Sequence, residues 1–462
     1  MEVPLHLLSA TELVALYSAR RLSPVEATTA VLAAIERHNP VLNAYCLVDG
    51  PRALDEARRS EARWMQGAPL GPIDGVPTSV KDLILTKPWP TLRGSRLVDP
   101  DQDWSQDAVL VENLRRSGAV LLGKTTTPEF GWKGVTDSPL VGVTRNPWNT
   151  SLTPGGSSGG AAVAAACGMG PLHVGTDGGG SIRIPASFTG VVGFKPTFGL
   201  VPRHPPSPYG TLSTAGAITR SVADASLMME VLAEPFDLDW YRIGALPAFG
   251  TPKGGVKGWR IVYSPTLSGA RVDPEVARVV AQAVHRFTEL GAQVTEVADV
   301  LPDSLMIFRS HWFAGAARQA SRLTAAQRRV LDQGFAYIAD QGSRITLNDY
   351  LDAVAQREAL GSRVMALFRD WDLLLTPTMP IPAFAAGHDS PPQSGRGQWT
   401  DWTPFTYPFN LTRHPAISIP CGFTKAGLPV GLQIVGPLAG DQRVLRAAYA
   451  FEQTQTLRLP PI

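Results

Sequence analysis

Cysteine is scarce in this chain of 462 residues, and its scarcity excludes two classes of protein. The three copies, Cys46, Cys167 and Cys421, are too few and too scattered for a disulfide framework. Their spacing also fits no structural zinc site. Such sparse cysteine is typical of proteins in a reducing compartment, so we expect a cytoplasmic protein.

An excess of charge and long apolar runs are missing as well. The chain has 42 basic and 40 acidic residues, a net charge of +2, which argues against nucleic acid as a direct partner. No run approaches about 20 uninterrupted apolar residues, so no membrane span is expected. The first residues show no basic segment before an apolar stretch, so no signal peptide is expected either.

Helix start signals open the chain. Residues 9–38 form two amphipathic patterns, each preceded by a capping-box pair, Ser9 with Glu12 and Ser23 with Glu26. From about residue 70 onward, short apolar runs between Gly and Pro alternate with helical patterns. This alternation favours an α/β layered core.

Further elements can be placed by pattern alone. The segment 416–435 alternates like a β-hairpin around residues 425–427, and residues 382–402 resemble a surface loop. Helical patterns cover residues 107–117, 158–167, 221–233, 274–290, most of 303–343, and 349–369.

Two segments match the residue patterns of catalytic motifs, but their surroundings do not fit those motifs. Residues 118–125 fit G-x-x-x-x-G-K-[ST], yet the four middle residues are apolar and read as a buried strand, not a phosphate-binding loop. Residues 156–160 fit G-x-S-x-G, centred on Ser158. No strand precedes that serine, and no histidine stands in a distinctive motif, so a Ser-His-Asp triad is disfavoured.

The most unusual segment, residues 153–199, contains two glycine-serine clusters. In the second cluster, three glycines precede Ser181 and leave backbone N–H groups unshielded, as an oxyanion-binding loop requires. The alternative is a simple tight turn.

A serine nucleophile also needs a base. Lys81 lies in an apolar segment, where burial can lower a lysine pKa from about 10.4 toward neutrality. Alternatively, Lys81 is the partner of Asp82 or Asp74.

Several motifs together resemble the amidase signature family. They are GVPTSVKD, ENLRRSGAVLLGKTTTPEF, TRNPWN, GGSSGG, GTDGGGSIRIPASFTGVVGFKPTFG, LLTPTMPIPAF and NLTRHPAISIPCGF. The resemblance implies an α/β amidase-signature fold, a single large domain over residues 1–462 with a central mixed β-sheet covered by helices on both faces. Within it we expect an N-terminal helical segment (1–68), a signature core (69–235) and a C-terminal part (236–462) with a helical insertion at about 303–370 and closing strands.

The resemblance also implies a Ser-cis-Ser-Lys triad. By motif, Lys81 is the base, Ser157 the bridging serine after a cis peptide bond, and Ser181 the nucleophile that forms an acyl-enzyme. The backbone N–H groups of Gly178, Gly179, Gly180 and Ser181 would form the oxyanion hole. Asp177, Arg183 and Ser158 would support the loop, although a purely structural ion pair is the alternative for Asp177 and Arg183. This relay needs no metal and no cofactor.

The expected reaction is hydrolysis of a small-molecule carboxylic amide to an acid and ammonia or an amine. One alternative is the glutaminase subunit of a glutamyl-tRNA amidotransferase, and another is a hydrolase of a related carbamate, hydrazide or ester. Where that subunit has a glutamine-binding aspartate this chain has Thr403, and Arg363 lies beside the expected arginine position. Gly131 and Trp132 are expected at the substrate, with Trp132 either a pocket wall for a bulky group or a packing residue. The family also suggests a homodimer.

Overall fold

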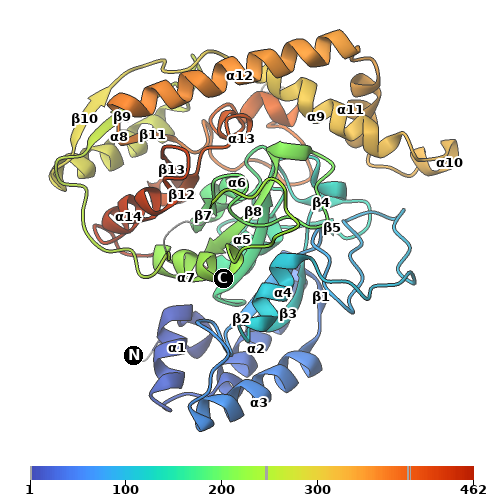
Figure 1. Cartoon of the computed structure of the whole chain (residues 1–462), viewed down its shortest axis with the longest axis vertical. Coiled ribbons are helices and arrows are strands. Elements are labelled where there is room, and N and C mark those ends of the chain that lie inside the picture. The colour runs from blue at the N-terminus through green and yellow to red at the C-terminus, as the bar shows by residue number, and fades with distance from the viewer. Residues whose placement is uncertain (1–2, 245–247, 393–394, 396) are drawn as a thin grey trace.

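The computed structural model describes residues 3–244, 248–392, 395 and 397–462. Its centre is one eleven-stranded sheet (Figure 1). In spatial order the strands are β1 (Tyr45–Val48), β3 (Val120–Thr125), β2 (Pro77–Lys81), β6 (Leu172–Asp177), β8 (Thr214–Thr219), β7 (Val192–Lys195), β12 (Ala416–Phe423), β13 (Pro429–Val435), β11 (Leu373–Pro377), β9 (Arg260–Tyr263) and β10 (Gln293–Glu296). A separate two-stranded ladder joins β4 (Asp137–Ser138) to β5 (Gly142–Val143).

The sheet is mixed, as predicted. Strands β3, β2 and β6 run parallel to one another, and so do β11, β9 and β10. The strands between these groups pair antiparallel, and β12 and β13 form the predicted closing hairpin. The carboxyl ends of β2 and β6 therefore meet at one edge of the sheet.

Helices cover both faces of the sheet. One apolar core joins the sheet to α4 (Val109–Arg116), α7 (Val222–Leu232), α8 (Pro274–Glu289) and α14 (Asp441–Glu452). On the other face, α2 (Pro24–Leu42), α3 (Gly50–Gln66), α5 (Gly159–Ala166) and part of α6 (Arg183–Thr189) share a second core. Successive residues of β3 show the alternation: Leu121 belongs to the first core, and Val120 and Leu122 belong to the second.

Two helical groups lie at opposite ends of the molecule (Figure 1). At one end are α1 (Ala10–Ser18), α2 and α3, and at the other are α9 (Leu305–Ala320), α10 (Ala325–Arg328), α11 (Gln333–Ser343) and α12 (Leu347–Asp370). Both predicted capping boxes are present at α1 and α2. None of the helices in the described residues has the length and apolar character that crossing a bilayer takes.

The prediction of a surface loop at 382–402 is wrong for its last residues. Residues 399–402 form a 3-10 helix, η4 (Trp399–Trp402), in which Trp399 and Trp402 are 2% and 0% exposed. The two indoles have a large apolar area. Burying this area stabilises the fold, so residues 399–402 are buried although the residues before them are polar. Residues 393, 394 and 396 of the predicted loop lie outside the described part of the chain.

Candidate active site

The candidate residues come from the end of one strand and from two loops, all at one edge of the sheet. Lys81 ends β2, and Ser181 follows the end of the neighbouring parallel strand β6. Ser157 stands just before α5, which packs on these strands. In open α/β sheets, ligands bind outside the carboxyl ends of the strands, and these loops occupy that position.

Lys81 is fully buried and has hydroxyl partners, not a carboxylate. Its Nζ lies 2.7 Å from Ser157 Oγ, 2.9 Å from Ser158 Oγ and 3.1 Å from Thr176 Oγ1. Burial lowers the pKa of Lys81 well below its ordinary value, and the charge of Asp177 offsets only part of this effect. Burial therefore favours the neutral amine of Lys81 over its ammonium form.

The alternative pairing of Lys81 with Asp82 or Asp74 is wrong. The Asp82 carboxylate lies 3.4 Å from the Nζ of Lys124, and the Asp74 carboxylate binds Arg63 at 2.6 Å. Since both acids already have a cationic partner, neither holds Lys81.

The two serine loops are joined through the backbone. The Ser158 N–H donates to the Ser181 carbonyl at 3.0 Å. The Gly156–Ser157 peptide bond is cis, as the resemblance implies. A Cβ atom at Gly131 would lie 3.4 Å from Ser157 Oγ and 2.7 Å from Leu83, so only glycine leaves this side of the bridging serine open. Within the described chain the Ser181 hydroxyl makes no hydrogen bond, and it faces the same cavity as Ser157.

The carboxylate of Asp177 holds the glycine loop. It accepts hydrogen bonds from the Gly180 N–H at 2.8 Å and the Ile182 N–H at 3.2 Å. The predicted oxyanion hole therefore needs a correction at Gly180, because its one donor is already engaged by Asp177. The N–H groups of Gly178, Gly179 and Ser181 donate to no other group in the described residues.

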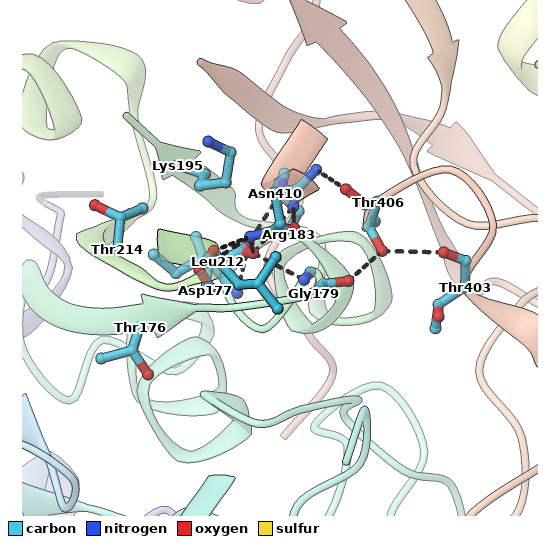
Figure 2. Close-up of polar contacts among 12 residues, drawn as sticks. Thr176, Asp177, Gly179, Arg183, Lys195, Leu212, Thr214, Thr403, Thr406 and Asn410 are labelled. Carbon is cyan, nitrogen blue, oxygen red and sulfur yellow. Dashed lines mark hydrogen bonds and ion pairs between the residues drawn. The ribbon is translucent and has the colours of Figure 1, made fainter. Parts of the chain in front are cut away.

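Arg183 anchors Asp177 to the C-terminal part of the chain. Its guanidinium donates two hydrogen bonds to Asp177, at 3.0 and 2.9 Å, and both side chains are fully buried (Figure 2). Burial alone would raise the pKa of Asp177, but Arg183 outweighs it and lowers that pKa to about 2. Asp177 is therefore a permanent anion at neutral pH.

Sequence reasoning missed the rest of this network. Asn410, on α13 (Pro408–Leu411), accepts from Arg183 at 2.7 Å and donates to Asp177 at 2.9 Å. The Thr406 hydroxyl donates to the Gly179 carbonyl at 2.7 Å (Figure 2). Gln433 accepts from Arg183 at 2.8 Å. These residues stand more than 220 positions from the loop, and no local pattern marks them.

A cavity of about 260 Å³ opens over Ser157 and Ser181. Most of its wall is apolar, and the ring of Trp312 stacks on that of Tyr209 with centroids 3.8 Å apart. Besides four prolines, the apolar and aromatic lining residues are Leu83, Ile84, Leu85, Ala108, Leu110, Phe130, Ala215, Tyr209 and Trp312. Among the described residues, no three histidine, cysteine or acidic side chains gather as metal ligands.

Of the predicted substrate residues, only Gly131 lines this cavity. The ring of Trp132 is instead buried against Gly334 of α11, where a Cβ atom would come within 2.4 Å of it. Thr403 is fully buried, and its hydroxyl donates to the Trp399 carbonyl at 3.3 Å. The expectation for Trp132 and Thr403 is thus corrected, because both side chains are used in packing.

Comparison with known proteins agrees with this geometry. The profile of the Amidase family matches residues 26–445. The chain is 38% identical over 460 residues to an acylamidase of Rhodococcus erythropolis, covering 98% of this chain and 96% of that one. This chain belongs to the amidase signature family.

Two other relatives of this amidase are an aryl acylamidase and an amidotransferase subunit. The crystal structure of a bacterial aryl acylamidase of the amidase signature family superposes with a TM-score of 0.91 at 32% identity, covering 98% of this chain and 97% of that one. A glutamyl-tRNA(Gln) amidotransferase subunit from Moorella thermoacetica is 35% identical over 483 residues, with 97% of each chain covered. Membership of the family makes the protein an amide-hydrolysing enzyme.

Proposed function

We propose that this amidase hydrolyses a small-molecule carboxylic amide through an acyl-enzyme on Ser181, with Ser157 and Lys81 as its proton relay. The observation that carries the proposal is the environment of Lys81. A buried lysine without a carboxylate partner, 2.7 Å from the Ser157 hydroxyl, is a neutral base aimed at a serine. A purely structural lysine would gain more from an ion pair.

The reaction then follows from the order of the three groups. Neutral Lys81 takes the proton of Ser157, Ser157 takes that of Ser181, and the Ser181 oxygen attacks the amide carbonyl. Ser157 then protonates the departing nitrogen as the C–N bond breaks, which leaves an ester on Ser181. Water enters, gives a proton to the same relay and attacks the ester, which releases the acid and restores the Ser181 hydroxyl.

The negative charge that develops on the carbonyl oxygen needs donors fixed in advance. We assign this role to the N–H groups of Gly178, Gly179 and Ser181. Asp177 and Arg183 act as positioning residues, because their buried pair fixes the loop that presents these donors. Ser158 supports the loop through its hydrogen bonds with Lys81 and with the Thr176 carbonyl, at 2.9 and 3.1 Å.

The cavity favours an amide with an apolar acyl or aryl part. Its aromatic wall suits a ring or a short chain, and one solved relative is an aryl acylamidase. A glutaminase subunit is the second candidate, on the strength of the 35% identity. Two features disfavour it: Thr403 is used in packing, and Arg363 lies exposed on α12. Carbamates, hydrazides and esters remain a third class, because the same relay would cleave them.

Three further proposals concern the compartment, the oligomeric state and the division of the domain. We place the protein in the cytoplasm, since its three cysteines are free thiols. The homodimer rests on family resemblance alone. The boundaries between the N-terminal segment, the signature core and the C-terminal part, at residues 68/69 and 235/236, also stay a prediction.

An amide panel tests this function with the purified chain. Initial rates would be measured for glutamine, short aliphatic amides and aryl anilides, with Ser181→Ala as the control. We expect the anilides to be hydrolysed by the chain alone and the variant to be inactive. If the chain alone cleaves no amide but becomes a glutaminase with a partner protein, the amidotransferase assignment replaces ours.

A further inference from the structure

Arg93 stands at the mouth of the active-site cavity. It lines the 260 Å³ cavity over Ser181 and also a wider outer hollow of about 820 Å³. Its carbonyl accepts from the Phe130 N–H at 2.8 Å, and Phe130 belongs to the cavity wall. At the next residue, Gly94, a Cβ atom would come within 2.6 Å of the Thr127 carbonyl. These contacts hold the loop against the cavity wall and fix the backbone position of Arg93.

The guanidinium of Arg93 has no partner of its own within the described chain: no hydrogen bond, and no carboxylate within 4.0 Å. Asp82 is the acid that faces it electrostatically. That carboxylate already lies 3.4 Å from Lys124 Nζ, and Lys124 and the backbone of Arg93 and Gly94 favour its charged form. Burial lowers the pKa of Arg93, yet an arginine keeps its charge at neutral pH. A positive charge is thus left over in the cavity wall.

The surroundings offer almost no counter-charge. Among the described residues, none that lines the inner cavity is acidic. Its other arginine, Arg203, is occupied by the carbonyls of Gly210 and Ser213. The outer hollow adds Arg318 and Arg322 against a single acid, Asp239.

The acids nearest by position are already engaged. Asp239 accepts from the N–H groups of Arg203 and Tyr241, at 2.9 and 3.0 Å. A third hollow, on another side of Arg93, contains Asp99 and Asp103. Their carboxylates accept the N–H groups of Asp101 and Ser105, each two residues further along the same loop. Among the described residues, Arg93 is therefore the unpartnered cation that lines the inner cavity as well as the outer hollow.

We propose that Arg93 is a specificity residue that binds a carboxylate on the substrate, so that this amidase prefers amides carrying an acid group beyond the reacting carbonyl. The inference rests on the proposed function. The apolar inner cavity holds the part next to the reacting bond, and the arginine meets the acid where the cavity widens. A planar guanidinium matches a carboxylate with two hydrogen bonds.

Matched anilides test the proposal. Acetanilide with a para-carboxylate places the acid on the amine side, and para-acetyl acetanilide is its neutral match. Succinanilate places the acid on the acyl side, with 4-oxopentananilide as its neutral match. For at least one pair, we expect the wild-type kcat/KM to favour the acid. Arg93→Met should reduce that preference about 10- to 100-fold, mainly through KM, because one charge-assisted contact is lost. Arg93→Lys should restore part of it.

Arg96→Met is the matched control, since Arg96 is exposed on the same loop and lies outside the three hollows. It should leave the preference as in the wild type. The pair that responds identifies the side of the amide bond that carries the acid. Cleavage of the neutral anilides with no preference for either acid, or a preference that survives in Arg93→Met, overturns the role of Arg93 and leaves the amidase function standing. If the wild type cleaves none of the four, the proposed function itself fails, and the carboxylate proposal with it.

Discussion

Lys81 Nζ lies between the hydroxyls of two consecutive serines, 2.7 Å from Ser157 and 2.9 Å from Ser158. The two contacts have similar lengths, but the serines differ in what else they bind. The Ser158 hydroxyl donates to the Thr176 carbonyl and accepts from the Thr176 N–H, so it is fully used inside the fold. The Ser157 hydroxyl has Lys81 as its partner and faces the cavity.

This difference predicts unequal effects of two neighbouring substitutions. Ser157→Ala should lower kcat on an anilide by about 10²- to 10⁴-fold, the usual contribution of a positioned proton-transfer group. Ser158→Ala should cost far less, because it removes a support and not a step of the relay. Initial-rate kinetics on both variants checks this, and thermal melting confirms that both remain folded. A larger loss for Ser158→Ala would contradict the order of the relay.

The environment of Lys81 predicts a pH dependence. Only the neutral amine takes a proton, so kcat/KM should rise as pH rises through the lysine pKa and then level off. Since burial lowers this pKa well below its ordinary value, the rise should be complete at a pH well below 10.5.

Lys81→Arg sharpens this test, because arginine keeps its charge at every accessible pH. The variant should lack activity across the whole profile. If it retains substantial activity, Lys81 acts as a cation and not as a base.

The glycine loop predicts a sharp steric effect. A Cβ atom at Gly179 would come within 2.6 Å of Phe308 and 2.8 Å of Trp399, so Gly179→Ala must displace the loop. Losing the alignment of one oxyanion donor costs about 10²- to 10³-fold in kcat. The control is Gly361→Ala on α12, where an added Cβ atom would have open space around it; it should leave kcat unchanged and stabilise the helix by about 1 kcal/mol. Equal kcat values for the two variants would remove Gly179 from the oxyanion hole.

Local chemistry explains what the sequence could predict. The capping boxes at Ser9 and Ser23, the buried strand at 120–125 and the hairpin at 416–435 each depend on neighbouring residues, and the structure contains all of them. The alternation of strands and helices likewise indicated the layered fold. The motifs identified Ser157 and Ser181, which line one cavity, and Lys81, which lies 2.7 Å from Ser157 Oγ, because each stands beside a recognisable strand or glycine cluster.

Long-range contacts explain what could not be predicted. Asn410 and Thr406 reach the glycine loop from the far end of the chain, and neither has a distinctive neighbourhood. Trp132 was ambiguous because an indole fills a core and a pocket equally well, and only the position of Gly334 decides between them. The occupied N–H of Gly180 depends on the direction in which Asp177 points, and composition does not fix that direction.

Labelling with a fluorophosphonate tests the nucleophile most directly. The reagent phosphonylates an activated serine, and mass spectrometry of the digested protein locates the adduct. We predict one adduct on Ser181, which Ser181→Ala abolishes and Lys81→Ala slows. An adduct on Ser158, or labelling that persists in Ser181→Ala, would contradict this assignment.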